Sequence, residues 1–157
     1  MKTCTICSDK YDAKPDICKS CYYEGRPLEN AFADELVEFA RITDSDWHAE
    51  HTGGGCFWLH TVVFGGHLTL TTWPEVMSCS DTPATIEERG WFLVATPTRD
   101  WEFGDSDACC AWPSDDVSGN APERGLSTGA LHFALVEAVD FLDQFEANIL
   151  RERICKF

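Results

Sequence analysis

The sequence of 157 residues lacks the features that would place it in or across a membrane. No apolar run approaches the about 18 residues that a membrane-spanning helix needs. The opening MKTCTICSDK also lacks the apolar stretch of a secretory signal. We therefore expect a protein of the cytoplasm, with no membrane partner and with thiols that stay reduced.

Basic residues are also scarce, and this shortage bears on the choice of partner. Twelve Lys and Arg stand against 27 Asp and Glu, which gives a formal net charge of -15. Residues 1–27 carry five basic and four acidic residues, so the remainder carries seven basic and 23 acidic ones. Such a field repels nucleic-acid phosphates. Nucleic acid is disfavoured as a partner, and only the weakly cationic N-terminal segment keeps it open as an alternative.

Cysteine, in contrast, is abundant, and four of the nine cysteines follow a recognisable pattern. Cys4 and Cys7 form one CxxC pair, and Cys18 and Cys21 form a second pair after ten intervening residues. Each CxxC turn lets two thiolates converge on Zn²⁺, and two turns complete a tetrahedral shell. The segment between them has little apolar content, so metal should supply its folding energy. The pattern predicts a structural Zn²⁺ site with no open position for water.

Disulfides or a redox-active CxxC motif would be the alternative uses of these cysteines. Disulfides need an oxidising compartment, for which the sequence shows no signal. A thioredoxin-like motif is expected within a βαβ pattern, which is not visible here. The other cysteines are predicted to be free thiols: Cys56, Cys79, Cys109, Cys110 and Cys155.

The remainder of the chain alternates short strand patterns with helical ones. Helices are predicted over residues 28–43, 82–89 and about 127–153. The second has capping signals, with Thr82 as the N-cap, Pro83 at the first helical position and Gly90 at the C-terminal stop. Strands are predicted over residues 46–52, 56–64, 67–73 and 91–96, with a further short strand at CCAW. We predict an α+β fold in which an antiparallel sheet of four or five strands packs against the long C-terminal helix.

This pattern divides the chain into two predicted parts. Residues 1–26 form the zinc-ribbon module, and residues 27–157 form the α+β domain. Within that domain, residues 98–125 form an acidic and mostly irregular loop. Loops of such length in compact domains are usually functional or disordered.

The glycine-rich turns predict how the first three strands pair. A two-residue turn at Gly65-Gly66 would place Phe64 opposite His67 and His60 opposite Thr71. A loop at residues 53–55 would place His48 opposite His60, Glu50 opposite Trp58 and Thr52 opposite Cys56.

This register gathers potential metal ligands on one face of the sheet. His48, His60, Glu50 and Cys56 form a possible second metal site, and the alternative is a set of outward polar residues on a half-solvated face. A small metal- or thiol-dependent enzyme with its site on this face is one alternative function. No catalytic residue is predicted, because no nucleophile, base and orienting residue can be assembled from the sequence.

Tryptophan supplies the candidate contacts for a protein partner, because it is enriched at binding hot spots. For each tryptophan the alternative is packing in the core. The candidates are Trp58, Trp73, Trp101 and Trp112. Our leading hypothesis is a non-enzymatic, zinc-containing module that binds a protein partner.

Two stretches resemble known families. CTIC…CKSC, over residues 4–21, resembles zinc-ribbon or zinc-knuckle modules, and this resemblance implies the four cysteines as ligands. EHTGGGC and the strand pattern around it, over residues 46–96, resemble a group of small uncharacterised proteins encoded by actinobacteria and their phages. The second resemblance implies no activity, but it suggests a phage protein that binds or modulates a host protein. Neither predicts an oligomeric state.

Overall fold

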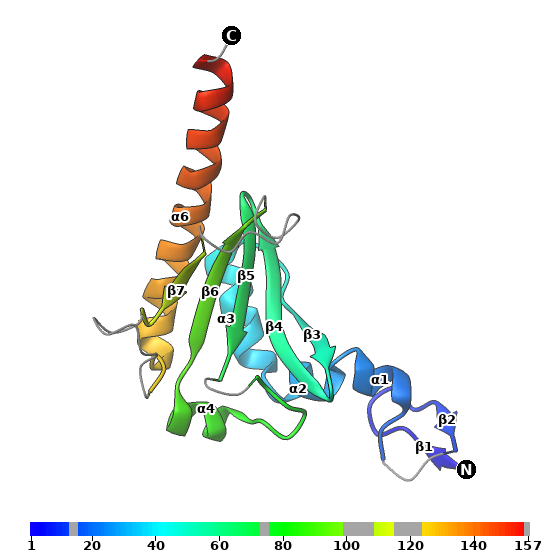
Figure 1. Cartoon of the computed structure of the whole chain (residues 1–157). Coiled ribbons are helices and arrows are strands. Elements are labelled where there is room, and N and C mark those ends of the chain that lie inside the picture. The colour runs from blue at the N-terminus through cyan, green and yellow to red at the C-terminus, as the bar shows by residue number, and fades with distance from the viewer. Residues whose placement is uncertain (13–15, 73–75, 99–108, 115–123, 156–157) are drawn as a thin grey trace.

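The computed structural model describes residues 1–12, 16–72, 76–98, 109–114 and 124–155. It is an α+β structure with a small N-terminal lobe beside a five-stranded antiparallel sheet (Figure 1). Helices cover one face of that sheet, and the long C-terminal helix runs past its end. No helix among the described residues is long and apolar enough to span a membrane.

The N-terminal lobe consists of a tiny hairpin followed by one short helix. Strand β1 (Lys2–Thr3) pairs antiparallel with β2 (Lys10–Tyr11), and α1 spans Lys19–Tyr23. Its small cluster of buried side chains is separate from the main core and consists of Cys4, Cys18 and Cys21. A lobe with so little apolar surface to bury needs another source of folding energy.

The predicted helix over residues 28–43 is in fact two helices, so that prediction is wrong in its continuity. Helix α2 (Arg26–Ala31) ends at Phe32, and α3 (Ala33–Thr43) begins directly after it. Phe32 leaves helical geometry, with φ -109° and ψ 25°, and is fully buried against Trp91. The apolar spacing is helical on both sides of the break, which is why the pattern did not show it.

The main sheet has the strand order β3-β4-β5-β6-β7, and every neighbouring pair is antiparallel. This confirms the predicted fold class. The strands are β3 (His48–Gly53), β4 (Cys56–Val63), β5 (Gly66–Thr71), β6 (Phe92–Pro97) and β7 (Cys110–Trp112).

The predicted register between β4 and β5 is wrong by two residues. The turn is Phe64-Gly65, so Val63 pairs with Gly66 and His60 pairs with Thr69 instead of Thr71. Gly65 has the positive φ that the turn requires, at 87°. Gly66 is a strand residue, and a Cβ there would lie 2.3 Å from the Thr96 carbonyl oxygen. A slip of two residues preserves the alternation of faces, so the predicted core face is retained.

The register between β3 and β4 agrees with the prediction along most of its length. His48 pairs with His60 and Glu50 pairs with Trp58, as predicted. The register then shifts between His51 and Gly53, so Cys56 pairs with Gly53 instead of Thr52. A bulge at the end of the hairpin explains this difference.

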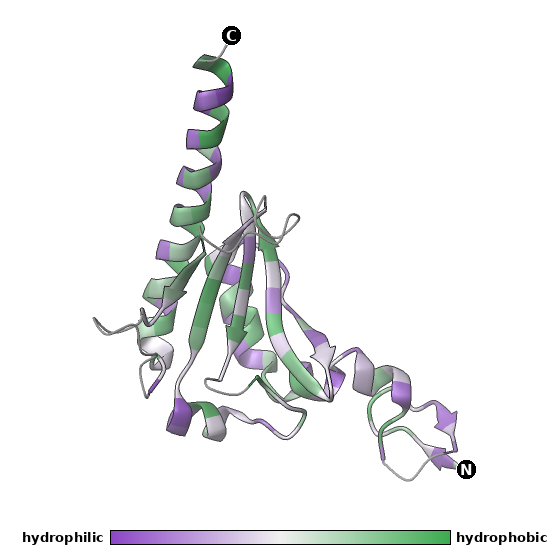
Figure 2. Cartoon of the chain, in the orientation of Figure 1, coloured by the Kyte–Doolittle hydropathy of each residue, from purple (hydrophilic) through white to green (hydrophobic). Residues whose placement is uncertain are grey.

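The core lies between the sheet and helices α3 and α6. Helix α6 (Thr128–Cys155) buries a stripe of Leu131, Leu135, Ala138 and Leu142, and green segments alternate with purple ones along it in Figure 2. Helix α4 (Pro83–Arg89) caps one end of the sheet, and its predicted Thr82 N-cap is confirmed. Most of the predicted loop 98–125 lies outside the described residues.

Candidate metal centre

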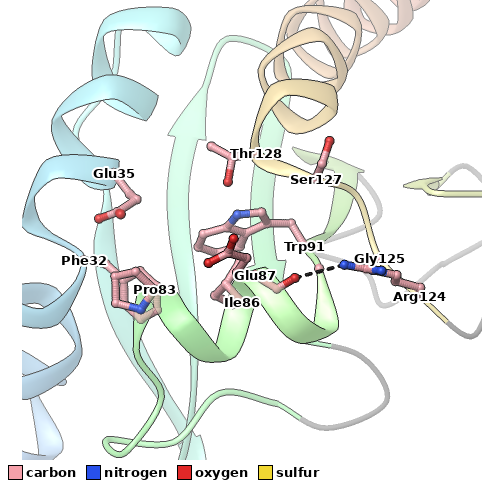
Figure 3. Close-up of a pocket in the computed structure, with 11 residues that line it drawn as sticks. Phe32, Glu35, Pro83, Ile86, Glu87, Trp91, Arg124, Gly125, Ser127 and Thr128 are labelled. Atoms are coloured by element: carbon pink, nitrogen blue, oxygen red, sulfur yellow. Dashed lines mark hydrogen bonds between the residues drawn. The ribbon is translucent and has the colours of Figure 1, made fainter.

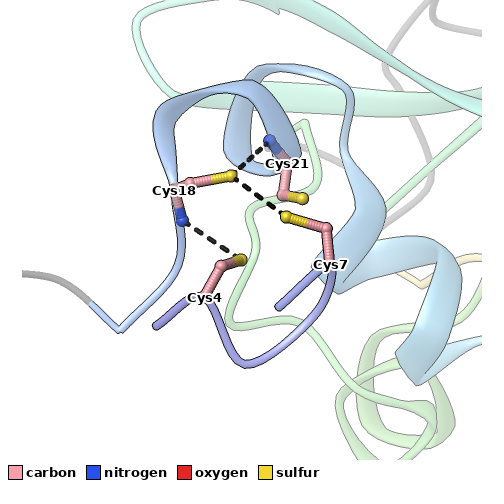
Figure 4. Close-up of side chains that lie close together, drawn as sticks. All are labelled: Cys4, Cys7, Cys18 and Cys21. Atoms are coloured by element: carbon pink, nitrogen blue, oxygen red, sulfur yellow. Dashed lines mark hydrogen bonds between the residues drawn. The ribbon is translucent and has the colours of Figure 1, made fainter. Parts of the chain in front are cut away.

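The four cysteines of the two CxxC pairs come together at the centre of the N-terminal lobe (Figure 4). Their Sγ atoms all lie within 4.8 Å of one another. The Sγ atoms of Cys7 and Cys18 are 3.7 Å apart. A tetrahedral ion with Zn–S bonds of about 2.3 Å would hold its sulfurs about 3.8 Å apart. The donor set therefore fits a tetrahedral thiophilic metal ion.

Local backbone geometry positions each thiol. Cys4 and Cys7 lie on a tight turn that closes through a bond from the Ser8 N–H to the Cys4 carbonyl, with Ser8 at a positive φ of 64°. Cys18 is the N-cap of α1, and its sulfur accepts from the Cys21 N–H, three residues on. The second CxxC pair therefore begins a helix, and its two thiols face those of the turn.

The sulfur of Cys4 receives backbone hydrogen bonds that suit a thiolate. The N–H groups of Cys18 and Ile6 point at it, with N···Sγ distances of 3.3 and 3.5 Å. Burial alone would raise the pKa of this thiol, but backbone N–H donation from Cys18, Cys7 and Ile6 lowers the pKa to about 6. The lobe is therefore arranged to hold negative charge on sulfur.

The pKa values of Cys7 and Cys21 are raised instead, so without a cation these two thiols stay protonated. The Asp9 backbone lowers the pKa of Cys7, but burial and the three neighbouring thiols raise it to about 12. Burial also raises the pKa of Cys21. Four thiolates cannot share so small a space unaided, whereas a divalent metal deprotonates its thiol ligands.

The lobe is joined to the sheet through the helix that carries Cys18 and Cys21. The ring of Tyr22 lies 5.8 Å from that of Phe57, and the ring of Tyr23 lies 5.1 Å from that of His51, measured between centroids. Gly25, which follows, is buried. The cysteine cluster and the packing against β3 and β4 therefore depend on the same short helix.

The histidine face carries a chain of close polar contacts. His60 Nδ1 lies 3.4 Å from a Glu50 carboxylate oxygen, and His60 Nε2 lies 3.0 Å from His67 Nδ1. His48 pairs with His60 across the strands, and Cys56 lies at the end of the hairpin. In the part of the chain that the structure describes, only the cysteine quartet brings three or more potential ligand atoms within reach of one ion.

Sequence reasoning missed the part played by His67. The incorrect register placed His67 opposite Phe64, although it pairs with Val62 and lies diagonally beside His60. A turn placed at Phe64-Gly65 would have revealed the contact.

Two of the four candidate tryptophans fall within the described residues. The indole N–H of Trp58 donates to Glu50, and that of Trp112 donates to Glu137 on α6. Both side chains are half-buried. Trp112 helps to attach β7 to α6. Trp73 and Trp101 lie outside the described residues.

No protein-family model, curated protein or solved structure matches this chain. The metal centre is therefore argued from cysteine spacing and sulfur geometry.

Proposed function

We propose that Cys4, Cys7, Cys18 and Cys21 bind one structural Zn²⁺, and that the protein is a non-enzymatic protein-interaction module. The observation that carries the proposal is the closed set of four sulfurs within 4.8 Å. Four thiolates fill a tetrahedral shell and leave no position for water or substrate, so the metal builds structure. Residues 1–26 then act as the metal-folded module attached to the α+β domain of residues 27–157.

Support for a protein partner comes from apolar side chains on α6. Leu150 and Ile154, near the end of the helix, are 44% and 74% exposed. This end of α6 extends beyond the sheet (Figure 1). An apolar face of a helix is normally buried against another element. We assign the partner-binding surface to this end of α6, with Trp58 on the sheet as a second candidate contact.

The resemblance of residues 46–96 to phage proteins is the basis for the setting that we propose. The partner is a host protein, bound in the cytoplasm, where thiols stay reduced and available to metal. The net charge of -15 keeps the protein away from nucleic acid.

Affinity capture from an actinobacterial lysate tests the proposal, with the zinc-loaded full chain as bait. We expect one protein in stoichiometric amount, lost when Leu150→Glu and Ile154→Glu are combined. The matched control is Val62→Glu, at an exposed apolar position on the sheet face of Trp58. If Val62→Glu abolishes capture and the α6 variant does not, the partner binds the sheet face instead of α6. Capture of nucleic acid, or of no protein, would contradict the proposal.

The Glu50–His60–His67 chain favours a second candidate function, a metal- or thiol-dependent enzyme. A carboxylate that orients an imidazole is a common element of general-base catalysis. Metal analysis of a variant with His48→Ala and His60→Ala separates the two functions. The binding module predicts unchanged metal content, whereas a second metal site on this face predicts the loss of one ion.

A further inference from the structure

A cavity of about 600 Å³ (Figure 3) lies beside α4, at the end of the sheet opposite the projecting end of α6 in Figure 1. It is bounded by the start of α3, by α4 and by the segment that leads into α6. This volume is in the range of small-molecule sites. The cavity is independent of the proposed zinc centre and of the proposed partner surface.

Backbone contacts hold the wall of this cavity in place. Trp91 and Leu126 exchange two backbone hydrogen bonds, with N···O distances of 2.8 and 2.7 Å. Next to this bridge, a Cβ on Gly90 would lie 2.4 Å from the Gly125 carbonyl carbon. Only residues without a Cβ allow these two segments of the backbone to approach so closely. The wall is therefore preformed, which lowers the entropic cost of binding a ligand.

The floor of the cavity is apolar and contains one unused hydrogen-bond donor. Phe32, Ile86 and Trp91 are at most 4% exposed, and the rings of Phe32 and Trp91 pack edge to face. The indole Nε1 of Trp91 is buried and has no hydrogen-bond partner among the described residues. In Figure 3 this nitrogen is on the ring edge nearest Thr128. A buried N–H without a partner costs free energy, which an acceptor on a ligand would recover.

The charged groups around the cavity indicate the sign of the charge that a ligand would carry. Glu35 and Glu87 line it, and no ion pair among the described residues involves either of them. The one cationic lining residue, Arg124, already donates to the Glu87 carbonyl oxygen at 3.1 Å. The net charge of -15 adds to the local attraction for cations.

We propose that this cavity binds a small organic cation that has an apolar body, an ammonium group and a hydrogen-bond acceptor. The apolar body packs on Phe32, Ile86 and the ring of Trp91. The acceptor receives a hydrogen bond from the indole N–H of Trp91. The ammonium group lies toward the carboxylates of Glu35 and Glu87.

The test uses three probes of similar shape and different charge on the full chain. 2-Amino-1-phenylethanol carries the ammonium group and a hydroxyl acceptor, 1-phenylethanol lacks the charge, and mandelate carries the opposite charge. The readout is the ¹H–¹⁵N cross-peak of the Trp91 indole, assigned through Trp91→Phe and through contacts of its ring with Phe32. We expect the amine to shift this cross-peak downfield in a saturable titration and to bind more tightly than the other two probes.

Charge-neutral variants complete the test without altering the floor. Glu35→Gln and Glu87→Gln should each raise the Kd of the amine about two- to fivefold, as expected for partly exposed charge pairs. Glu88→Gln, an exposed neighbour on α4 that does not line the cavity, is the matched control and should leave the Kd unchanged. Tighter binding of mandelate, an equal effect of the control, or no shift of the Trp91 cross-peak at millimolar amine would overturn the proposal.

Discussion

At the scale of single residues, the four cysteines are the main evidence for a metal site, because their surroundings differ from those of ordinary buried thiols. Cys4 is 2% exposed and Cys21 is 1% exposed, yet two further sulfurs lie beside this pair, and several backbone N–H groups point at Cys4. Apolar packing would explain burial, but it would not explain four sulfurs that all lie within 4.8 Å of one another. A metal ion explains both observations.

The first prediction compares a proposed ligand with a remote thiol. Cys7→Ser should weaken zinc binding by more than the roughly 10- to 100-fold that outer partners of a metal site contribute, because it removes a direct ligand. Cys109→Ser, at an exposed position, should leave zinc affinity unchanged. Competition with a chromogenic chelator measures both affinities. Equal zinc affinities in the two variants would show that Cys7 is not a zinc ligand.

The second prediction concerns His60 and pH. Burial lowers the pKa of His60; Glu50 opposes this shift and His48 reinforces it. At His60, the folded protein therefore binds fewer protons than the unfolded chain, in which a histidine titrates near about 6.5. The free energy of unfolding should fall as pH decreases through this value, and the fall from His60 should end once pH passes below its folded pKa.

His60→Gln removes this contribution while keeping a polar side chain that can contact Glu50 and His67. Urea unfolding at pH about 7.5 and about 5.5, on either side of the ordinary histidine value, measures the difference. The variant should lose less stability between the two conditions than the natural chain does. A loss of equal size would show that His60 contributes nothing to the pH dependence.

At the scale of elements, glycines decide geometry that hydrophobic periodicity does not specify. Gly65 supplies the positive φ of the β4–β5 turn. A Cβ on Gly66 would also lie 2.8 Å from Leu142 Cδ2, so this position lets α6 approach the sheet. A Cβ on Gly65 would also meet the Leu142 carbonyl group. Both glycines therefore allow α6 to approach the sheet, and Gly65 serves the turn as well.

The third prediction separates these roles from ordinary helix propensity. Gly66→Ala should destabilise the fold by about 1–3 kcal/mol, because the new methyl group meets the Thr96 carbonyl and Leu142. Gly129→Ala is the control, because no atom lies within 4 Å of its Cβ position in the first turn of α6. It should stabilise the protein by up to about 1 kcal/mol. Denaturant unfolding measures both, and a neutral Gly66→Ala would contradict the packing argument.

Local patterns predicted most elements, but not the details that depend on distant contacts. Capping signals located α4, and apolar spacing located α6. The break at Phe32 escaped prediction because its cause is burial against Trp91, which is remote in sequence. The β4–β5 turn was misplaced because Gly66 is explained by α6 and Thr96, not by its neighbours. Cysteine spacing predicted the quartet, whereas the cavity at Trp91 needs three separate segments and left no local signal.

At the scale of the whole molecule, the two buried clusters differ in how they are stabilised. The main core contains large apolar side chains from α3, the sheet and α6. Among the described residues, the N-terminal cluster contains three buried cysteines, with Ile6, Cys7, Tyr11 and Ile17 packed against them. The first can fold by hydrophobic burial, and we propose that the second depends on metal.

The fourth prediction follows from this difference. Removing metal with a chelator should unfold residues 1–26 and leave the sheet folded. Hydrogen exchange should show lost protection in α1 and retained protection in β4 and β5, because these strands lie in the centre of the sheet. Readdition of zinc should restore α1. Simultaneous loss of protection in both parts would contradict separate sources of stability.

X-ray absorption at the zinc edge, measured on the purified full chain, tests the four-thiolate zinc site most directly. We predict one zinc per chain with four sulfur neighbours at about 2.3 Å. A folded N-terminal lobe without zinc, or a zinc shell containing nitrogen or oxygen ligands, would contradict it.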